Sequence, residues 1–145
     1  MIHGTKSTSG LFFRVLASGF ILFMLVIVTI ANRGEGDRWW SFIHSIPYGD
    51  KIGHVGLMGM LCLLCNLAFT PRRFRFLPAF ISRVTFILFA LITLEELSQA
   101  FIATRTCDLL DWLADLTGLA LGQMVATYIR KFFQTTSTNP IHNTP

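Results

Sequence analysis

The side chains best suited to chemistry gather between positions 50 and 115. They are Asp50, Lys51, His54, Glu95, Glu96, Gln99, Arg105, Asp108, Asp111 and Asp115. Helical spacing places several on common faces, since Asp50 and His54 are four residues apart and Asp108, Asp111 and Asp115 are three and four apart. Neighbouring carboxyl groups in a medium of low dielectric separate into a proton donor and a proton acceptor. We therefore expect acid–base chemistry, with Glu96, His54 and Asp111 as the catalytic candidates.

The same residues also offer ligands to a metal ion. His54, Glu96, Asp111 and Asp115 would supply nitrogen and oxygen atoms to a hard or borderline divalent cation. No standard metal-ligand spacing is present in the sequence. A divalent cation is thus the one cofactor that the sequence suggests, and its identity stays open.

The composition tells which kind of fold must hold these residues. Of 145 residues, 52% are hydrophobic and 14% are charged, and the mean hydropathy is +0.57. Soluble domains carry roughly a quarter of charged residues. This balance excludes a disordered chain, a soluble nucleic-acid-binding domain and most soluble enzymes, and it predicts an integral membrane protein.

Apolar residues concentrate in four stretches, at about 11–31, 52–69, 79–103 and 109–133. A helix needs about 20 apolar residues to cross a bilayer, and none of the stretches alternates with the period of two that barrel strands require. We predict an all-α fold, an integral membrane four-helix bundle that forms a single domain over 11–133. Residues 1–10 and the polar tail 134–145, which we expect to be disordered, flank it. The first stretch is too long for the apolar region of a signal peptide, so we expect it to be retained.

Charges are sorted between the two predicted sides of the membrane. One side holds eight cations and no acid: Lys6, Arg14, Arg72, Arg73, Arg75, Arg83, Arg130 and Lys131. The other side holds all eight acids and the remaining four of the 12 cations. By the positive-inside rule, both termini are cytoplasmic. The net charge of +4 therefore reflects topology and implies no nucleic-acid partner.

The charged groups inside the predicted spans need an explanation. An ionised side chain near the bilayer centre costs at least ~2.5–3.5 kcal/mol, so these groups must face one another or a wet cavity. All of them fall in the outer half, and the inner halves of the second and third spans read as almost wholly apolar. We expect a polar pocket open to the outer face. Interhelical ion pairs, of Arg105 with Asp108 or Asp111 and of Lys51 with Asp50, are one alternative, and an ion or proton pathway is another.

Small and aromatic residues support the helical layout. Gly118 and Gly122 continue the acidic face of the fourth span, and the second span has Gly53, Gly56 and Gly59, so we expect both helices to pack closely. Trp39, Trp40, Tyr48 and Trp112 fall at the outer interface, where residues 39–46 are expected to form a short surface helix. We expect Cys62 and Cys65 to be packing residues.

The order of the polar residues resembles the VanZ-like family, named for a glycopeptide (teicoplanin) resistance protein. The matching positions are Asp50-Lys51-x-x-His54, Glu96-x-x-Gln99, Arg105, Asp108, Asp111, Asp115, Gly118 and Gly122. The resemblance covers about residues 50–122, and it departs at Asp115, where the family commonly has Asn. It implies a multi-pass protein of the bacterial cytoplasmic (inner) membrane that is linked to the cell envelope and to glycopeptide resistance. It brings no settled reaction with it.

Together these observations predict a pocket in the outer leaflet that binds or modifies a lipid-linked or amphipathic envelope component. Lys51 and Arg105 would contact anionic oxygens. Gln99, Asp50, Asp108 and Asp115 would complete the binding site. Membrane lipids and a lipid-linked envelope precursor are the expected partners, and the oligomeric state stays open. The alternative is a non-enzymatic membrane scaffold whose charged cluster only holds the helices together.

Overall fold

The chain folds into five helices and, in the part that we describe, no strand. The computed structural model describes residues 5–69, 72, 74, 75, 77, 78, 80–105 and 107–137. The helices are α1 (Thr5–Asn32), α2 (Gly36–His44), α3 (Gly49–Ala68), α4 (Arg83–Gln99) and α5 (Leu109–Ser137). The all-helical prediction is confirmed for these residues.

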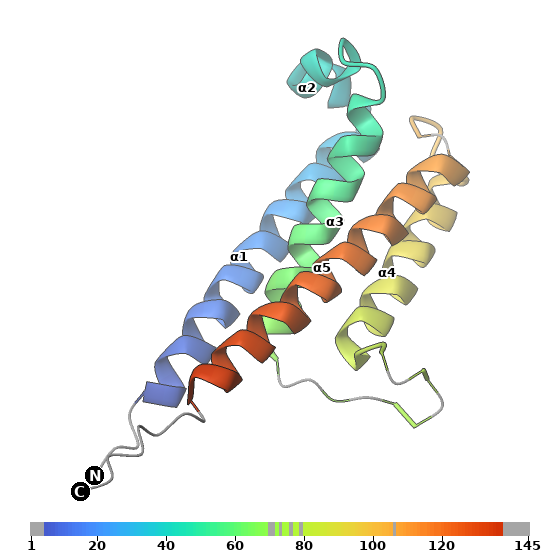
Figure 1. Ribbon diagram of the computed structural model, residues 1–145. Coiled ribbons are helices and arrows are strands. Elements are labelled where there is room, and N and C mark those ends of the chain that lie inside the picture. Colours follow the sequence, from blue (N-terminus) through green and yellow to red (C-terminus); the bar gives the residue numbers. More distant parts are fainter. Residues whose placement is uncertain are drawn as a thin grey trace, which may run out of the picture.

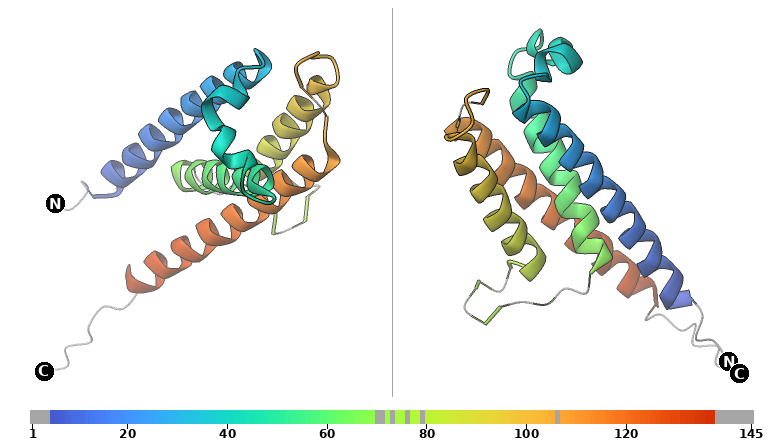
Figure 2. Two further views of the ribbon diagram at one scale, coloured as in Figure 1. Left: turned by 90° about the horizontal axis from the view of Figure 1, so that it is seen from above. Right: turned by 180° about the vertical axis from the view of Figure 1, so that it is seen from behind.

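The four long helices run alongside one another, and the short α2 lies at one end of them, beside the ends of α1 and α3 (Figure 1). At this end, which we call the α2 end, the N-terminal ends of α3 and α5 meet the C-terminal end of α4. The first residue of α1 and the last residue of α5 both lie at the opposite end, which we call the terminal end (Figures 1 and 2). The chain therefore crosses the length of the molecule four times and returns to the end at which it began.

The helix boundaries differ from the predicted spans at several places. α1 begins at Thr5, six residues before the predicted start, and α5 continues to Ser137, so residues 134–137 are helical and not part of a disordered tail. Residues 1–4 and 138–145 lie outside the described part of the chain. α4 is shorter than the predicted 79–103 because Ser82 caps it, with its side chain accepting a hydrogen bond from the backbone N–H of Thr85. Residues 39–46 do form most of a short helix, since α2 covers Gly36–His44.

Two of the helices are long and apolar enough to span a membrane. These are Gly10–Asn32 within α1, with a mean hydropathy of 2.6, and Gly49–Ala68, with a mean hydropathy of 1.5. α4 has 17 residues, which span about 25 Å at 1.5 Å per residue. α5 is longer but carries Asp111, Asp115 and Gln123 among its apolar residues. Of the four predicted spans, two thus meet the criterion of length and hydropathy.

α3 is the central helix. It packs most extensively against α5, and it also contacts α1, α4 and α2. α4 packs on α5 as well as on α3. The core between the helices includes Leu61, Cys62, Cys65, Leu88 and Leu119. Both cysteines are thus core residues, as expected.

Glycines allow α3 and α5 to approach closely. A Cβ atom on Gly118 would lie 2.6 Å from the carbonyl oxygen of Val55 and 2.9 Å from the nitrogen of Gly59. A Cβ atom on Gly122 would lie 2.9 Å from the Cβ of Cys62 and would overlap the carbonyl oxygen of Gly59. The predicted role is therefore confirmed for these glycines. It is wrong for Gly53 and Gly56, because a Cβ atom on either would meet nothing within 4 Å.

Candidate functional site

Lys51, in the first turn of α3, lies at the centre of an ion-pair group at the α2 end. Its Nζ donates to Asp50 Oδ2 at 3.0 Å, to Asp108 Oδ2 at 2.8 Å and to Asp111 Oδ1. The Lys51 side chain is 21% exposed, and Asp111 is similarly shielded at 20%. One ammonium group thus joins α3 to the start of α5 through three carboxylates. This confirms the expected Lys51–Asp50 pair and adds two others.

His54 lies one turn further along α3 and forms a second connection to α5. Its Nδ1 is 2.8 Å from Asp115 Oδ1, and its Nε2 is 4.0 Å from Asp111 Oδ1. The Asp115 side chain is 3% exposed, whereas His54 keeps 27% of its side-chain surface accessible. Since an ionised carboxylate only accepts hydrogen bonds, Nδ1 is the donor to Asp115 in that state. Nε2 then points its lone pair toward the side of Asp111.

Glu96 and Gln99 bring α4 into the same group. Gln99 Nε2 donates to Glu95 Oε2 at 2.9 Å and to Glu96 Oε2 at 3.1 Å. The other oxygen of Glu96 accepts from the backbone N–H of Asp108 at 2.8 Å. Glu96 and Gln99 are 4% and 2% exposed. A buried carboxylate on α4 therefore fixes the segment that starts α5.

Asp108 has two roles in this arrangement. It immediately precedes α5, and its Oδ1 accepts from the backbone N–H of Leu110 at 2.8 Å, which is an N-cap interaction. Its other oxygen accepts from Lys51. These two hydrogen bonds, with that of Lys51 the stronger, hold the pKa of the Asp108 carboxyl below its ordinary value of 3.8.

We call these residues the polar cluster. It comprises Asp50, Lys51, His54, Glu95, Glu96, Gln99, Asp108, Asp111 and Asp115. Nine of the ten residues singled out from the sequence are thus joined by hydrogen bonds or ion pairs at one end of the molecule. The cluster holds six carboxyl groups and a single lysine. Its bonds connect α3, α4 and α5, as the requirement that charged groups face one another had predicted.

Arg105 is the tenth residue and does not join the polar cluster. The expected pairs of Arg105 with Asp108 or Asp111 do not form, and in the described part of the chain its Nε is buried without a hydrogen-bond partner. The α4–α5 loop explains this, because the backbone N–H of Arg105 bonds Ile102 O and the neighbouring Thr104 bonds Asn32 O on α1. The loop is thereby held against α1. Lys51 takes the carboxylates that Arg105 was expected to bind.

The candidate metal set of His54, Glu96, Asp111 and Asp115 is not assembled. Within the described ranges, no group of three or more His, Cys, Asp or Glu side chains is placed to hold a metal ion. His54 and Asp115 bond each other, while Glu96 is directed to Gln99 and to the backbone of Asp108. These side chains are thus engaged by other groups of the protein.

A second polar network lies toward the terminal end, and sequence reasoning missed it. Asn66 Nδ2 donates to Thr85 Oγ1 at 2.9 Å, and Ser82 Oγ donates to Asn66 Oδ1 at 2.6 Å. Gln123 Oε1 accepts from the backbone N–H of Ser82 at 2.9 Å. Asn66, Ser82 and Thr85 are all buried. The inner halves of the second and third spans, predicted to be almost wholly apolar, therefore contain a buried network of neutral polar side chains.

This second network also completes the end of α3. The guanidinium of Arg130 donates to the carbonyl oxygens of Asn66 and Phe69. The last carbonyls of a helix have no partner within it, and a cation there also interacts favourably with the helix dipole. The signal in the sequence was Ser82 followed three residues later by Thr85, at the place where a new helix begins. The network explains how polar side chains are accommodated between apolar helices.

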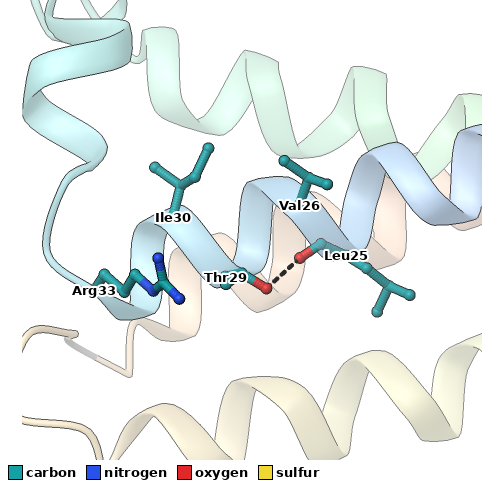
Figure 3. A pocket seen from close by; sticks show the side chains of 5 residues that line it. All are labelled: Leu25, Val26, Thr29, Ile30 and Arg33. Atoms are coloured by element: carbon teal, nitrogen blue, oxygen red, sulfur yellow. Dashed lines mark hydrogen bonds between the residues drawn. The ribbon is translucent and has the colours of Figure 1, made fainter.

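A shallow furrow of about 300 Å³ runs along the outside of α1 near the α2 end (Figure 3). It is lined by Leu25, Val26, Thr29, Ile30 and Arg33. None of these residues belongs to the polar cluster, whose side chains bond one another. The expected polar pocket and this furrow are therefore different features.

Comparisons with protein-family models, with curated proteins and with solved structures find no match to this chain.

Proposed function

We propose that this chain is a VanZ-like, multi-pass protein of the bacterial cytoplasmic membrane whose polar cluster lies in the outer leaflet. There it binds or modifies a lipid-linked or amphipathic envelope component, with an effect on glycopeptide (teicoplanin) tolerance. In this proposal the four long helices are a membrane bundle with both termini in the cytoplasm. The observation that carries the proposal is the His54–Asp115 pair, in which Asp115 is buried, His54 is partly exposed, and Nε2 of the histidine takes no part in the bond to Asp115.

Burial of ionisable groups among apolar helices supports a functional role. Such groups are costly within a membrane and by default mark functional positions. Asp115 orients the imidazole through Nδ1, and the opposite nitrogen is left with a lone pair that can take a proton. Asp111, held by Lys51, faces that nitrogen at 4.0 Å. A base and a neighbouring carboxyl group are together sufficient to transfer a proton to and from a bound head group.

The distribution of charge supports the proposed topology. Arg14, Arg130 and Lys131 lie at the terminal end, and so do Arg72 and Arg75 between α3 and α4. The carboxylates of the polar cluster lie at the α2 end. By the positive-inside rule this distribution favours a cytoplasmic location for the terminal end. A reporter enzyme fused after Pro145 should then be active only in the cytoplasm, and activity outside the membrane would overturn the topology.

The functional role is tested by His54→Gln, which keeps a polar side chain but removes the base. Ser82→Ala is the control, since it removes a buried polar group from the network at the other end. Both variants are expressed in a teicoplanin-sensitive bacterial host, and the minimal inhibitory concentration is compared with that of the wild type. We expect His54→Gln alone to abolish any protection that the wild type gives. Full protection by His54→Gln at equal protein level would refute the proposal.

The scaffold remains a second candidate because the polar cluster is internally bonded. Lys51 reaches three carboxylates, and Glu96 ties α4 to the start of α5, so the cluster could serve to hold helices together. Under this alternative, His54→Gln and Asp111→Asn should lower the melting temperature in detergent by several degrees. Under the proposed function, both variants should stay close to the wild type in melting temperature and lose the phenotype.

A further inference from the structure

Two buried side-chain atoms have no hydrogen-bond partner among the residues described, and both occur where α1 meets the α4–α5 loop. They are the Nε of Arg105 and the Oδ1 of Asn32. Thr104, next to Arg105, donates to the backbone oxygen of Asn32 at 2.7 Å, which joins the two segments. Buried polar groups are nearly always hydrogen-bonded. A donor and an acceptor that both lack a partner at the same helix–loop contact therefore indicate a bound group or a water molecule there.

Arg105 differs from Lys51 in what surrounds it. Lys51 is engaged by three carboxylates, whereas no carboxylate of the described chain lies within ion-pair distance of Arg105. Arg105 is half-buried as a residue, so part of its surface is reachable from outside although its Nε is buried. The planar fork of a guanidinium fits two oxygens of one phosphate group. Of these two cations at the α2 end, Arg105 is therefore the one equipped to take an external anion.

An apolar furrow on α1 ends one residue from Asn32 in the sequence. Its lining runs along α1 from Leu25 to Arg33, the residue that follows Asn32 (Figure 3). Thr29, an uncharged polar residue of the lining, donates its hydroxyl to Leu25 O at 2.7 Å, so this hydroxyl is not a free donor and Arg33 is the charged group of the furrow. A volume of about 300 Å³ equals roughly ten waters at about 30 Å³ each. That space accepts part of an acyl chain, and Arg33 adds a cation at its end.

We propose that these features together bind one molecule of an anionic phospholipid with hydroxyl groups on its head. The phosphate accepts from Arg105, a head-group hydroxyl donates to Asn32 Oδ1, and one acyl chain lies in the furrow. The inference rests on the proposed membrane location and deepens it, since it assigns the phosphate to Arg105 and not to Lys51. It also explains why Arg105 stands apart from the polar cluster.

The test uses the full chain in detergent and native mass spectrometry with three probes. Dioleoylphosphatidylglycerol carries both the chains and the polar head, dioleoylglycerol carries the chains without the phosphate, and glycerol 3-phosphate carries the phosphate and hydroxyl groups without the chains. We expect one phosphatidylglycerol to bind, with dioleoylglycerol and glycerol phosphate each at least tenfold weaker. Glycerol phosphate binding as well as the lipid would refute the lipid site and indicate a free-phosphate site. Equal binding of phosphatidylglycerol and dioleoylglycerol would refute the phosphate contact. It would indicate that a water molecule binds the Nε of Arg105 and the Oδ1 of Asn32.

Variants separate the two parts of the site. Arg105→Gln should weaken phosphatidylglycerol binding tenfold or more, and Arg105→Lys should fall between it and the wild type because the charge stays and the fork is lost. Val26→Trp, at a position 50% exposed, should fill the furrow and weaken the lipid but not glycerol phosphate. Arg38→Gln is the control, since it removes an equal charge from exposed α2, and it should stay within twofold. Equal effects of Arg105→Gln and Arg38→Gln would refute the inference.

The outcome is distinguishable from failure of the proposed function. Loss of selective lipid binding would leave the His54-dependent phenotype untouched. Conversely, a reporter that places the C-terminus outside the cell would refute the proposed topology, while binding in detergent would still report on Arg105.

Discussion

Replacing Gly118 by alanine tests whether α3 and α5 are held together by close backbone contact. The new Cβ atom would lie 2.6 Å from Val55 O and 2.9 Å from Gly59 N. Carbon–oxygen contacts across helices are about 3.3–3.6 Å, so the helices must part by about 0.7 Å or more. Because both obstructing atoms belong to the backbone, no side-chain rotation can relieve the overlap.

The magnitude follows from two opposing effects. Overpacking of a tight interface costs about 1–3 kcal/mol, and rigid backbone neighbours place this site at the upper end. Alanine in place of glycine within a helix stabilises by about 1 kcal/mol. We expect Gly118→Ala to lower the free energy of unfolding by about 2 kcal/mol.

Gly53→Ala is the matched control, because it lies in α3 and its Cβ would meet nothing within 4 Å. This variant should gain up to about 1 kcal/mol from helix propensity alone. The two variants should thus differ by about 3 kcal/mol, or roughly a hundredfold in the unfolding equilibrium. The assay is circular dichroism of purified protein in dodecyl maltoside micelles titrated with sodium dodecyl sulfate. Equal stability of the two alanine variants would refute the packing of α3 on α5 through Gly118.

Three further predictions concern the networks at the two ends. Lys51→Gln leaves three carboxylates without their cation and should destabilise the fold by about 1–2 kcal/mol, an effect that high salt reduces in the same titration. Because the pKa of Asp108 is lowered in the folded state, its ionised form stabilises the fold above about pH 4. The difference in stability between wild type and Asp108→Asn should therefore be constant from pH 7 to about 4.5 and decrease as the pH falls below about 4 toward the folded pKa. A difference that does not decrease below about pH 4 would contradict this prediction. Ser82→Ala removes the cap of α4 and one partner of Asn66, so it should cost about 1–2 kcal/mol, and unchanged thermal melting would count against the network.

Much of the polar cluster was readable from spacing alone. The i, i+3 and i+4 relations among Asp108, Asp111 and Asp115 predicted one acidic face, and the cost of unpaired charges among apolar helices predicted that other helices would meet that face. The structure has Lys51 and His54 of α3 facing it. These inferences succeed because helical geometry and desolvation act over a few residues and need no tertiary information.

Other features depended on contacts that no local pattern encodes. Arg105 and Lys51 have the same charge, and Arg105 is much the closer of the two to Asp108 and Asp111 in the sequence. Which of them pairs depends on how the α4–α5 loop docks, and the bond from Thr104 to Asn32 holds it on α1. Likewise, Asn66 lies in a run of apolar residues and becomes explicable only beside Ser82 and Thr85 from α4.

By itself, the sequence determined that the chain is all-helical, that it is too apolar for an ordinary soluble domain, and that its acids converge at one end. Hydrophobic periodicity and the penalty for isolated charge are enough to dictate these properties. Only the tertiary structure decided which glycines bring α3 and α5 together, which cation the carboxylates hold, and which polar atoms stay open. These outcomes depend on distances of tenths of an ångström between segments up to 72 residues apart, and such distances are set only when the helices pack.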